Sequence, residues 1–132
     1  MDYIEYVSKE NTMITIYQIQ LSDLDIIQVN GGQMPERAKA KFSISASPDN
    51  FKYDMLKFYK EVCTVDTDDL EKAFELTNLW EEPSKVTKFG RMSSTSIGDI
   101  FLKGNCFYIV DTFGFSALPI FNDEVEMIGC AA

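Results

Sequence analysis

Histidine is absent from this 132-residue chain, and cysteine occurs only at Cys63, Cys106 and Cys130. Without histidine the chain has no Ser-His or Cys-His nucleophile pair, no histidine acid–base catalyst and no histidine metal site. The three cysteines show neither the spacing of a zinc knuckle nor that of a redox motif. We therefore expect a non-enzymatic protein with no catalytic residues, no metal and no cofactor.

Basic residues and long apolar runs are also scarce. The chain has 12 Lys and Arg against 21 Asp and Glu, which gives a net charge of −9. Such a surface repels nucleic acid and anionic membranes, whereas it attracts basic protein surfaces. No apolar run approaches the ~20 residues of a membrane span, and the first residues lack the pattern of a signal peptide. We expect a cytoplasmic protein that binds neither nucleic acid directly nor a membrane.

The residues that are present suit one globular domain. Hydrophobic residues make up 45% of the chain and aromatic residues 13%, enough for a core without disulfide or metal support. Residues 1–12 are poorly periodic and are interpreted as an N-terminal extension. The domain is predicted over residues 13–120, and residues 121–132 form an acidic C-terminal tail.

Periodicity predicts the elements of the first half. Alternating residues over 14–21 predict a half-buried strand with Gln18 on its outer face. Ser22 is a plausible N-cap for a short helix that ends at an Asn-Gly-Gly sequence. Residues 42–46 alternate and fit a short edge strand or a flexible segment. The apolar spacing over 48–58 predicts a helix.

The second half predicts a sheet with one more helix. Gly104 and Asn105 have the chemistry of a two-residue hairpin turn. The expected elements are a strand over 59–66, a helix from a Thr67 or Asp68 cap to Asn78, a strand over 85–89, the hairpin, and a bent strand over 112–118. This order predicts an α+β fold with a mainly antiparallel sheet, a C-terminal hairpin or meander and two to three short helices.

Acidic residues crowd the region of the predicted 67–78 helix, where only Lys72 opposes them. This cluster is a candidate contact surface for a basic partner, with a tryptophan as an anchor. A solvated helix face with acids near the helix start accounts for the same pattern. The candidate partner-binding residues are Asp68, Asp69, Glu71, Glu75, Trp80, Glu81 and Glu82.

A serine-rich turn before the hairpin is the second candidate site. Its hydroxyls and backbone N–H groups are of the kind that hold a small anion, although no phosphate-loop spacing is present. Capping of the turn by the same side chains is the alternative. The candidate ligand-binding residues are Arg91, Ser94, Ser96, Gly98, Asp99 and Asp111.

The same turn carries a resemblance that extends over roughly residues 13–118. The pattern reads Ser94-x-Ser96-x-Gly98-Asp99, then Gly104, then Tyr108-x-Val110-Asp111, then Phe113-Gly114-Phe115. It resembles the C-terminal signature of small uncharacterised proteins of bacteriophages and conjugative elements that have a YodL-type domain. The resemblance implies a mobile-element origin and a role in host interaction or counter-defence.

Three functional hypotheses follow. The first is a phage or mobile-element accessory protein that binds a host protein, in one variant a nucleic-acid-binding protein, through the acidic surface. The second is a protein, or a minor enzyme, that binds a small anionic ligand at the serine-rich turn. The third is a structural component of a virion.

Overall fold

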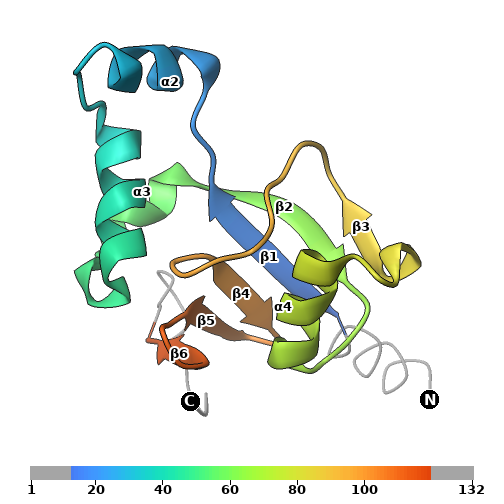
Figure 1. Ribbon diagram of the computed structural model, residues 1–132. Helices are drawn as coiled ribbons and strands as arrows, with labels where there is room; N and C mark the ends of the chain where they lie inside the picture. The colour runs from blue at the N-terminus through green and yellow to red at the C-terminus, as the bar shows by residue number, and fades with distance from the viewer. Residues whose placement is uncertain (1–12, 120–132) are drawn as a thin grey trace, which may run out of the picture.

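Six antiparallel strands form a single sheet in the computed structural model, which describes residues 13–119 (Figure 1). The strands, which stand side by side in the order β3-β2-β1-β4-β5-β6, are β1 (Ile14–Ile19), β2 (Tyr59–Val65), β3 (Val86–Lys88), β4 (Ile100–Lys103), β5 (Cys106–Val110) and β6 (Phe115–Leu118). The α-helices are α2 (Asp23–Asn30), α3 (Glu36–Ala46) and α4 (Leu70–Leu79), and the short 3-10 helices are η1 (Pro48–Asn50), η2 (Tyr53–Phe58) and η3 (Pro83–Lys85). The predicted α+β class and the C-terminal meander are confirmed.

The meander follows its turn residues. Gly104 has a φ of 62° and joins β4 to β5 together with Asn105, as the hairpin signal predicts. The chain then bends at residues 112–114, where Gly114 has a φ of 78°, and only afterwards forms β6. The predicted bent strand over 112–118 is therefore a turn followed by a shorter strand.

Residues 42–46 form the last part of α3 and not an edge strand. Ala40 and Ile44 are both buried against the sheet, and their spacing of four residues places them on one face of a helix. Phe42, between them, is exposed. Packing of this face decides the conformation, whereas the alternation over five residues is too short to do so.

The single helix predicted over 48–58 is also wrong, because η1 and η2 are separated by extended backbone at Phe51 and Lys52. The ring of Phe51 lies 6.1 Å from that of Tyr59 on the sheet. Phe51 and Phe58 both pack against the buried core. The apolar spacing thus identified the side chains that face the core, while tertiary contacts set the backbone.

The core consists of two clusters on opposite faces of the sheet. Ile100 and Phe101 are neighbours on β4 but belong to different clusters, and Ile109 and Val110 on β5 are divided in the same way. Successive side chains of a strand point to opposite faces. Helix α4 packs on one cluster, whereas α3 and η2 pack on the other. Figure 1 shows α4 in front of the strands.

The link from β3 to β4, residues 89–99, has to cross two strands, because β2 and β1 stand between β3 and β4 (Figure 1). Gln18 of β1 lies against this link and is only 1% exposed. Its amide nitrogen donates to the carbonyl oxygen of Ser93 at 3.0 Å and to the carboxylate of Asp99 at 2.9 Å. The prediction that Gln18 lies on an outer face is wrong, because the link covers it.

Thr95 ties the same link to α4. Its hydroxyl lies 2.8 Å from the hydroxyl of Thr77 and accepts a hydrogen bond of 2.8 Å from the side-chain amide of Asn78. Thr95 and Thr77 are both buried. Buried hydroxyls need such partners, so the two contacts hold the link against the helix. The link is therefore bound to β1 on one side and to α4 on the other.

We predict that Gly98→Ala lowers the free energy of unfolding by about 2 kcal/mol or more, measured by urea denaturation. Gly98 has a φ of 97°, and a Cβ there would lie 2.7 Å from Cγ2 of Ile44. Gly31 is the matched control, because its φ is −89° and its Cβ would come no nearer than 3.4 Å to any atom. Gly31→Ala should change the stability by less than about 1 kcal/mol. Equal losses in both variants would contradict the role given to Gly98.

Candidate functional site

Helix α4 carries the candidate acidic surface and is capped at both ends. The side chain of Asp69 accepts hydrogen bonds from the N–H groups of Glu71 at 2.9 Å and Lys72 at 3.2 Å. The N-cap is therefore Asp69 and not Thr67 or Asp68, and the helix continues one residue past Asn78. Trp80 ends the helix with a φ of 56°. Two fixed ends make this helix a rigid support for its side chains.

The predicted partner-binding acids lie on and around this helix. All are exposed except Glu82, which is half-buried. Residues 61–82 contain eight Asp or Glu and one Lys, so this segment alone has a net charge of −7. The helix is about 15 Å long, and Lys72 near its start contacts both Glu75 and Glu82, which brings acids from the helix and from the segment after it close together. We call Asp68, Asp69, Glu71, Glu75, Glu81 and Glu82 the acidic α4 surface.

Lys72 neutralises part of this surface. Its ammonium lies 3.2 Å from a carboxylate oxygen of Glu75 and 3.5 Å from one of Glu82. The hydrogen bond that Lys72 donates to Glu75, together with the charge of Glu75, raises the pKa of Lys72. Within residues 13–119, Asp68, Glu71 and Glu81 form no salt bridge. These three carboxylates are the charges that a partner meets without having to break an ion pair.

Trp80, the predicted anchor, is half-buried, and the ammonium of Lys88 lies 5.2 Å from its ring centroid. Lys88 therefore covers one face of the ring. The more exposed apolar side chains near the acids are Leu79, at 58%, and Phe89, at 54%. Sequence reasoning missed both. The only signal for Leu79 was that it falls outside the apolar stripe of the helix.

The serine-rich turn uses its carboxylate internally. Asp99 is buried, and one of its oxygens accepts hydrogen bonds from the Gln18 amide and from the N–H of Ser96, each at 2.9 Å. Burial raises the pKa of Asp99 to about 6, against the opposing effect of the Gln18 hydrogen bond. The adjacent cavity, which Lys41 and Tyr59 also line, has a volume of about 10 Å³. This space holds at most one water molecule.

Asp111 has a similar local role in the next turn. Its carboxylate accepts from the Ser116 hydroxyl and from the N–H of Thr112, each at 2.7 Å, and its own N–H donates to the carbonyl of Gly114 at 2.9 Å. The Ser116 hydrogen bond is the main reason why the pKa of Asp111 is lowered. Asp99 and Asp111 thus hold separate turns and do not share a ligand position.

The other predicted ligand-binding residues do not surround a common space. Ser94 and Ser96 are exposed, whereas Gly98 is buried beneath Ile44. Arg91 is exposed and lines a different cleft, between the β3–β4 link and α2. Over residues 13–119, no three Cys, Asp or Glu side chains gather closely enough to hold a metal ion.

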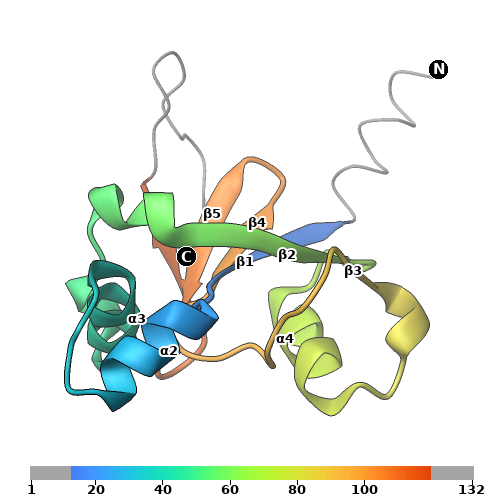
Figure 2. The same cartoon turned by 90° about the horizontal axis from the view of Figure 1, so that it is seen from above.

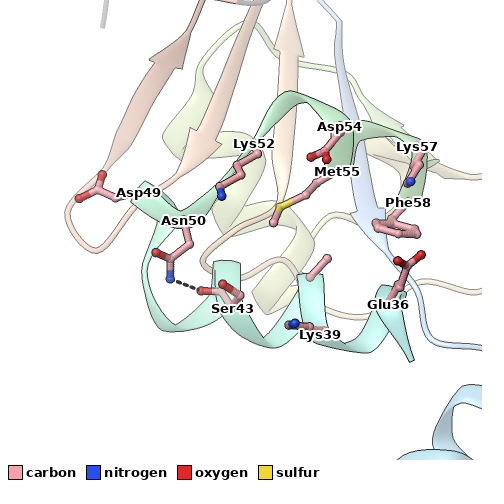
Figure 3. A pocket seen from close by; sticks show the side chains of 11 residues that line it. Glu36, Lys39, Ser43, Asp49, Asn50, Lys52, Asp54, Met55, Lys57 and Phe58 are labelled. Atoms are coloured by element: carbon pink, nitrogen blue, oxygen red, sulfur yellow. Dashed lines mark hydrogen bonds between the residues drawn. The ribbon is translucent and has the colours of Figure 1, made fainter. Parts of the chain in front are cut away.

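Figure 3 shows a groove of about 530 Å³ between α3 and the η1–η2 segment, which sequence reasoning did not find. At one end the Asn50 amide donates to the carbonyl of Ser43 at 2.9 Å. Three lysines and three acids line it, and none of the six forms a salt bridge within the described part of the chain. The charged lining residues are Lys39, Lys52, Lys57, Glu36, Asp49 and Asp54. The groove has no net charge and favours neither an anion nor a cation.

Comparison with known proteins identifies no relative: no family model, no curated protein and no solved structure matches this chain. Among the helices of residues 13–119, none has the length and apolar character that crossing a membrane requires.

Asp69→Ala should lower the free energy of unfolding by about 1 kcal/mol, because it removes the N-cap of α4. Asp68→Ala, which removes the neighbouring charge but no cap, should stay within about 0.5 kcal/mol of the parent protein. Urea denaturation of the two variants under the same conditions measures both. If Asp68→Ala is the more harmful change, the assignment of the cap is wrong.

Asp99 should make the stability depend on pH in a defined direction. Its pKa is raised in the folded state, so its contribution to stability is complete below the unfolded pKa of about 4 and is lost as the pH rises through about 6. Asp99→Asn keeps an oxygen acceptor and never ionises. Between about pH 4 and pH 7.5, the free energy of unfolding of the variant should rise by up to about 3 kcal/mol relative to that of the parent protein.

Denaturation curves recorded across this pH range test the role of Asp99. Asp111→Asn is the control, because the pKa of Asp111 is lowered and its contribution is lost in the opposite direction, as the pH falls. Parallel stability curves for the parent protein and Asp99→Asn would show that Asp99 is not the buried titrating group.

Proposed function

We propose that this protein is a non-enzymatic binding protein whose acidic α4 surface engages a basic surface on a partner macromolecule. The observation that carries the proposal is the concentration of charge, a net −7 over residues 61–82, on and around helix α4, whose start is capped by the Asp69 side chain. Charge fixed on a rigid element loses little conformational entropy on binding. Complementary potentials also accelerate encounter and favour one class of partner.

A nucleic-acid-binding protein is the partner that this surface fits best. Its binding site presents Lys and Arg to phosphate groups, so a row of fixed carboxylates can occupy the same site. The acidic α4 surface would then act as a decoy and exclude nucleic acid. The resemblance to small phage and mobile-element proteins agrees with this activity. We accordingly propose a host-interaction or counter-defence role in the cytoplasm of a host cell.

The internal contacts of the candidate catalytic groups support a binding role. Asp99 and Asp111 are both used to hold turns, and the full chain has no histidine to act as a base. The alternative of a small anionic ligand at the serine-rich turn has less support, because the cavity beside Asp99 has a volume of about 10 Å³. A surface contact requires no cavity.

The test is charge reversal of Asp68, Glu71 and Glu81, which leaves the cap at Asp69 and the salt bridges of Lys72 intact. The tagged triple Lys variant should capture at least about tenfold less of the partner from a bacterial lysate than the parent protein does. Capture by the parent protein should weaken as the salt concentration rises. A short DNA duplex should compete for the captured partner.

The matched control reverses the same number of exposed acids elsewhere: Glu36, Asp49 and Asp54 on the groove of Figure 3. This variant changes the net charge by the same amount but leaves the acidic α4 surface unaltered. It should therefore capture the partner as well as the parent protein does. If the α4 variant captures the partner as well as the parent protein does, the acidic α4 surface does not bind the partner. If DNA does not compete for the captured partner, the partner is basic but the protein is not a nucleic-acid decoy.

A further inference from the structure

Helix α2 has one of its two acids, Asp25, inside, whereas Asp23 and the large apolar residues are exposed. Leu24, Ile26 and Ile27 are 61%, 43% and 66% exposed, whereas the only buried residue of the helix is Asp25, at 7%. Soluble proteins rarely expose several large apolar side chains on one short element unless that element binds something. Leu24 and Ile27 are three residues apart and share one face of the helix, whereas Ile26 lies to one side of that face; we call these three residues the α2 patch.

This orientation is fixed by polar contacts. The carboxylate of Asp25 lies 2.8 Å from the guanidinium of Arg37 on α3 and accepts the N–H of Ser22 at 2.9 Å. The Ser22 hydroxyl in turn accepts the N–H of Asp25 at 3.0 Å, which completes a capping box. The buried acid therefore holds the helix in place. The exposure of the apolar residues is a property of the folded helix and not of a frayed end.

A cleft of about 290 Å³ lies beside the patch, between α2 and the β3–β4 link. Its walls are mainly apolar and include Ile26 and Met92, and two cations, Lys41 and Arg91, stand at its border. Lys41 donates to the carbonyl of Ile19 at 2.7 Å. Neither cation forms a salt bridge with any residue of 13–119. The cleft thus combines an apolar lining with positive charge, in a protein whose net charge is −9.

We propose that α2 and this cleft bind an acidic amphipathic helix of a partner protein. The apolar face of that helix packs on Leu24 and Ile27 and inserts a side chain beside Ile26, while its carboxylates meet Lys41 and Arg91. With 8 residues, α2 is about 12 Å long and accommodates two turns of a bound helix. Apolar anchors at positions i, i+3 and i+4 are how amphipathic helices occupy such surfaces.

This binding surface is distinct from the acidic α4 surface. Figure 2 shows α2 and α4 at two separate places on the body of the protein. The two surfaces also differ in chemistry, since one takes a basic partner and the other an acidic, apolar one. The inference goes beyond the proposed function, and each of the two can fail while the other holds.

The experiment uses the full chain with labelled Ile and Leu methyl groups, observed by NMR. The probe is a synthetic acidic amphipathic peptide of about 18 residues, with Leu at helical spacing and Glu on the other face. Two further peptides are controls: a scramble of the same composition, and a version with Lys in place of Glu. We expect the acidic peptide to shift the methyl signals of Leu24, Ile26 and Ile27 saturably, and neither control peptide to do so.

Three variants locate the contact. Ile27→Glu and Arg91→Glu should each weaken binding of the acidic peptide at least about tenfold, because each places a carboxylate where the acidic peptide binds. Both side chains are exposed, so neither substitution should disturb the fold. Phe113→Glu is the matched control, because Phe113 is 93% exposed on the turn before β6. It introduces the same charge as Ile27→Glu and removes a still more exposed apolar group, and it should bind the peptide like the parent protein.

Four outcomes would overturn the inference. They are equal binding of the scrambled peptide, shifts located away from α2, a change of the α2 signals when residues 120–132 are removed, and a change of these signals with protein concentration. An effect of removing residues 120–132 would assign the patch to the chain's own C-terminal end, and an effect of protein concentration would assign it to a second copy of the chain. The Asp68, Glu71 and Glu81 charge-reversal variant should still bind the peptide, so failure of the acidic-surface proposal can be recognised separately.

Discussion

The structure depends on the buried contact between the Gln18 amide and the Asp99 carboxylate. The sheet order forces residues 89–99 to cross β2 and β1, and a crossing segment loses water from both its backbone and the strand beneath it. Gln18 supplies hydrogen bonds in place of this water, because its side-chain amide contacts both Ser93 and Asp99. Asp99 immediately precedes β4, and its carbonyl accepts a hydrogen bond of 2.9 Å from the N–H of Val110. The register of the whole C-terminal meander follows from this point.

This arrangement leaves two surfaces that do not take part in the core. Residues 61–82 carry a net charge of −7, whereas residues 36–60 carry six Lys or Arg and three acids, a net charge of +3. The two segments that supply the helices on opposite faces of the sheet, α4 on one and α3 with η2 on the other, therefore have opposite net charge. Charges separated in this way orient a charged partner before contact, most strongly at low salt. A chain with a single domain can consequently present two different binding surfaces.

The sequence predicted the parts of the fold that local chemistry determines. The Gly104–Asn105 hairpin and the body of α4 are decided by neighbouring residues, and both were predicted. The parts that failed depend on distant contacts: α3 at 42–46 needs the sheet beneath Ile44, and the burial of Gln18 needs a link 75 residues away. For the candidate site, the acidic residues around α4 could be predicted, because they are concentrated in one stretch of the sequence. The exposure of the apolar residues of α2 could not be predicted, because the inward position of Asp25 depends on its contact with Arg37.

The residue pattern of the serine-rich turn and the meander has a structural role in this chain. Gly98 has a positive φ beneath Ile44, Asp99 binds the crossing link, and Asp111 closes the turn at Gly114. Each of these residues satisfies a backbone demand of the crossing or of a turn, so each is needed wherever the same topology is built. A signature of this kind identifies an architecture and not a chemistry. Binding in this chain is therefore argued from surfaces outside the pattern, on α4 and α2, where substitutions leave the crossing intact.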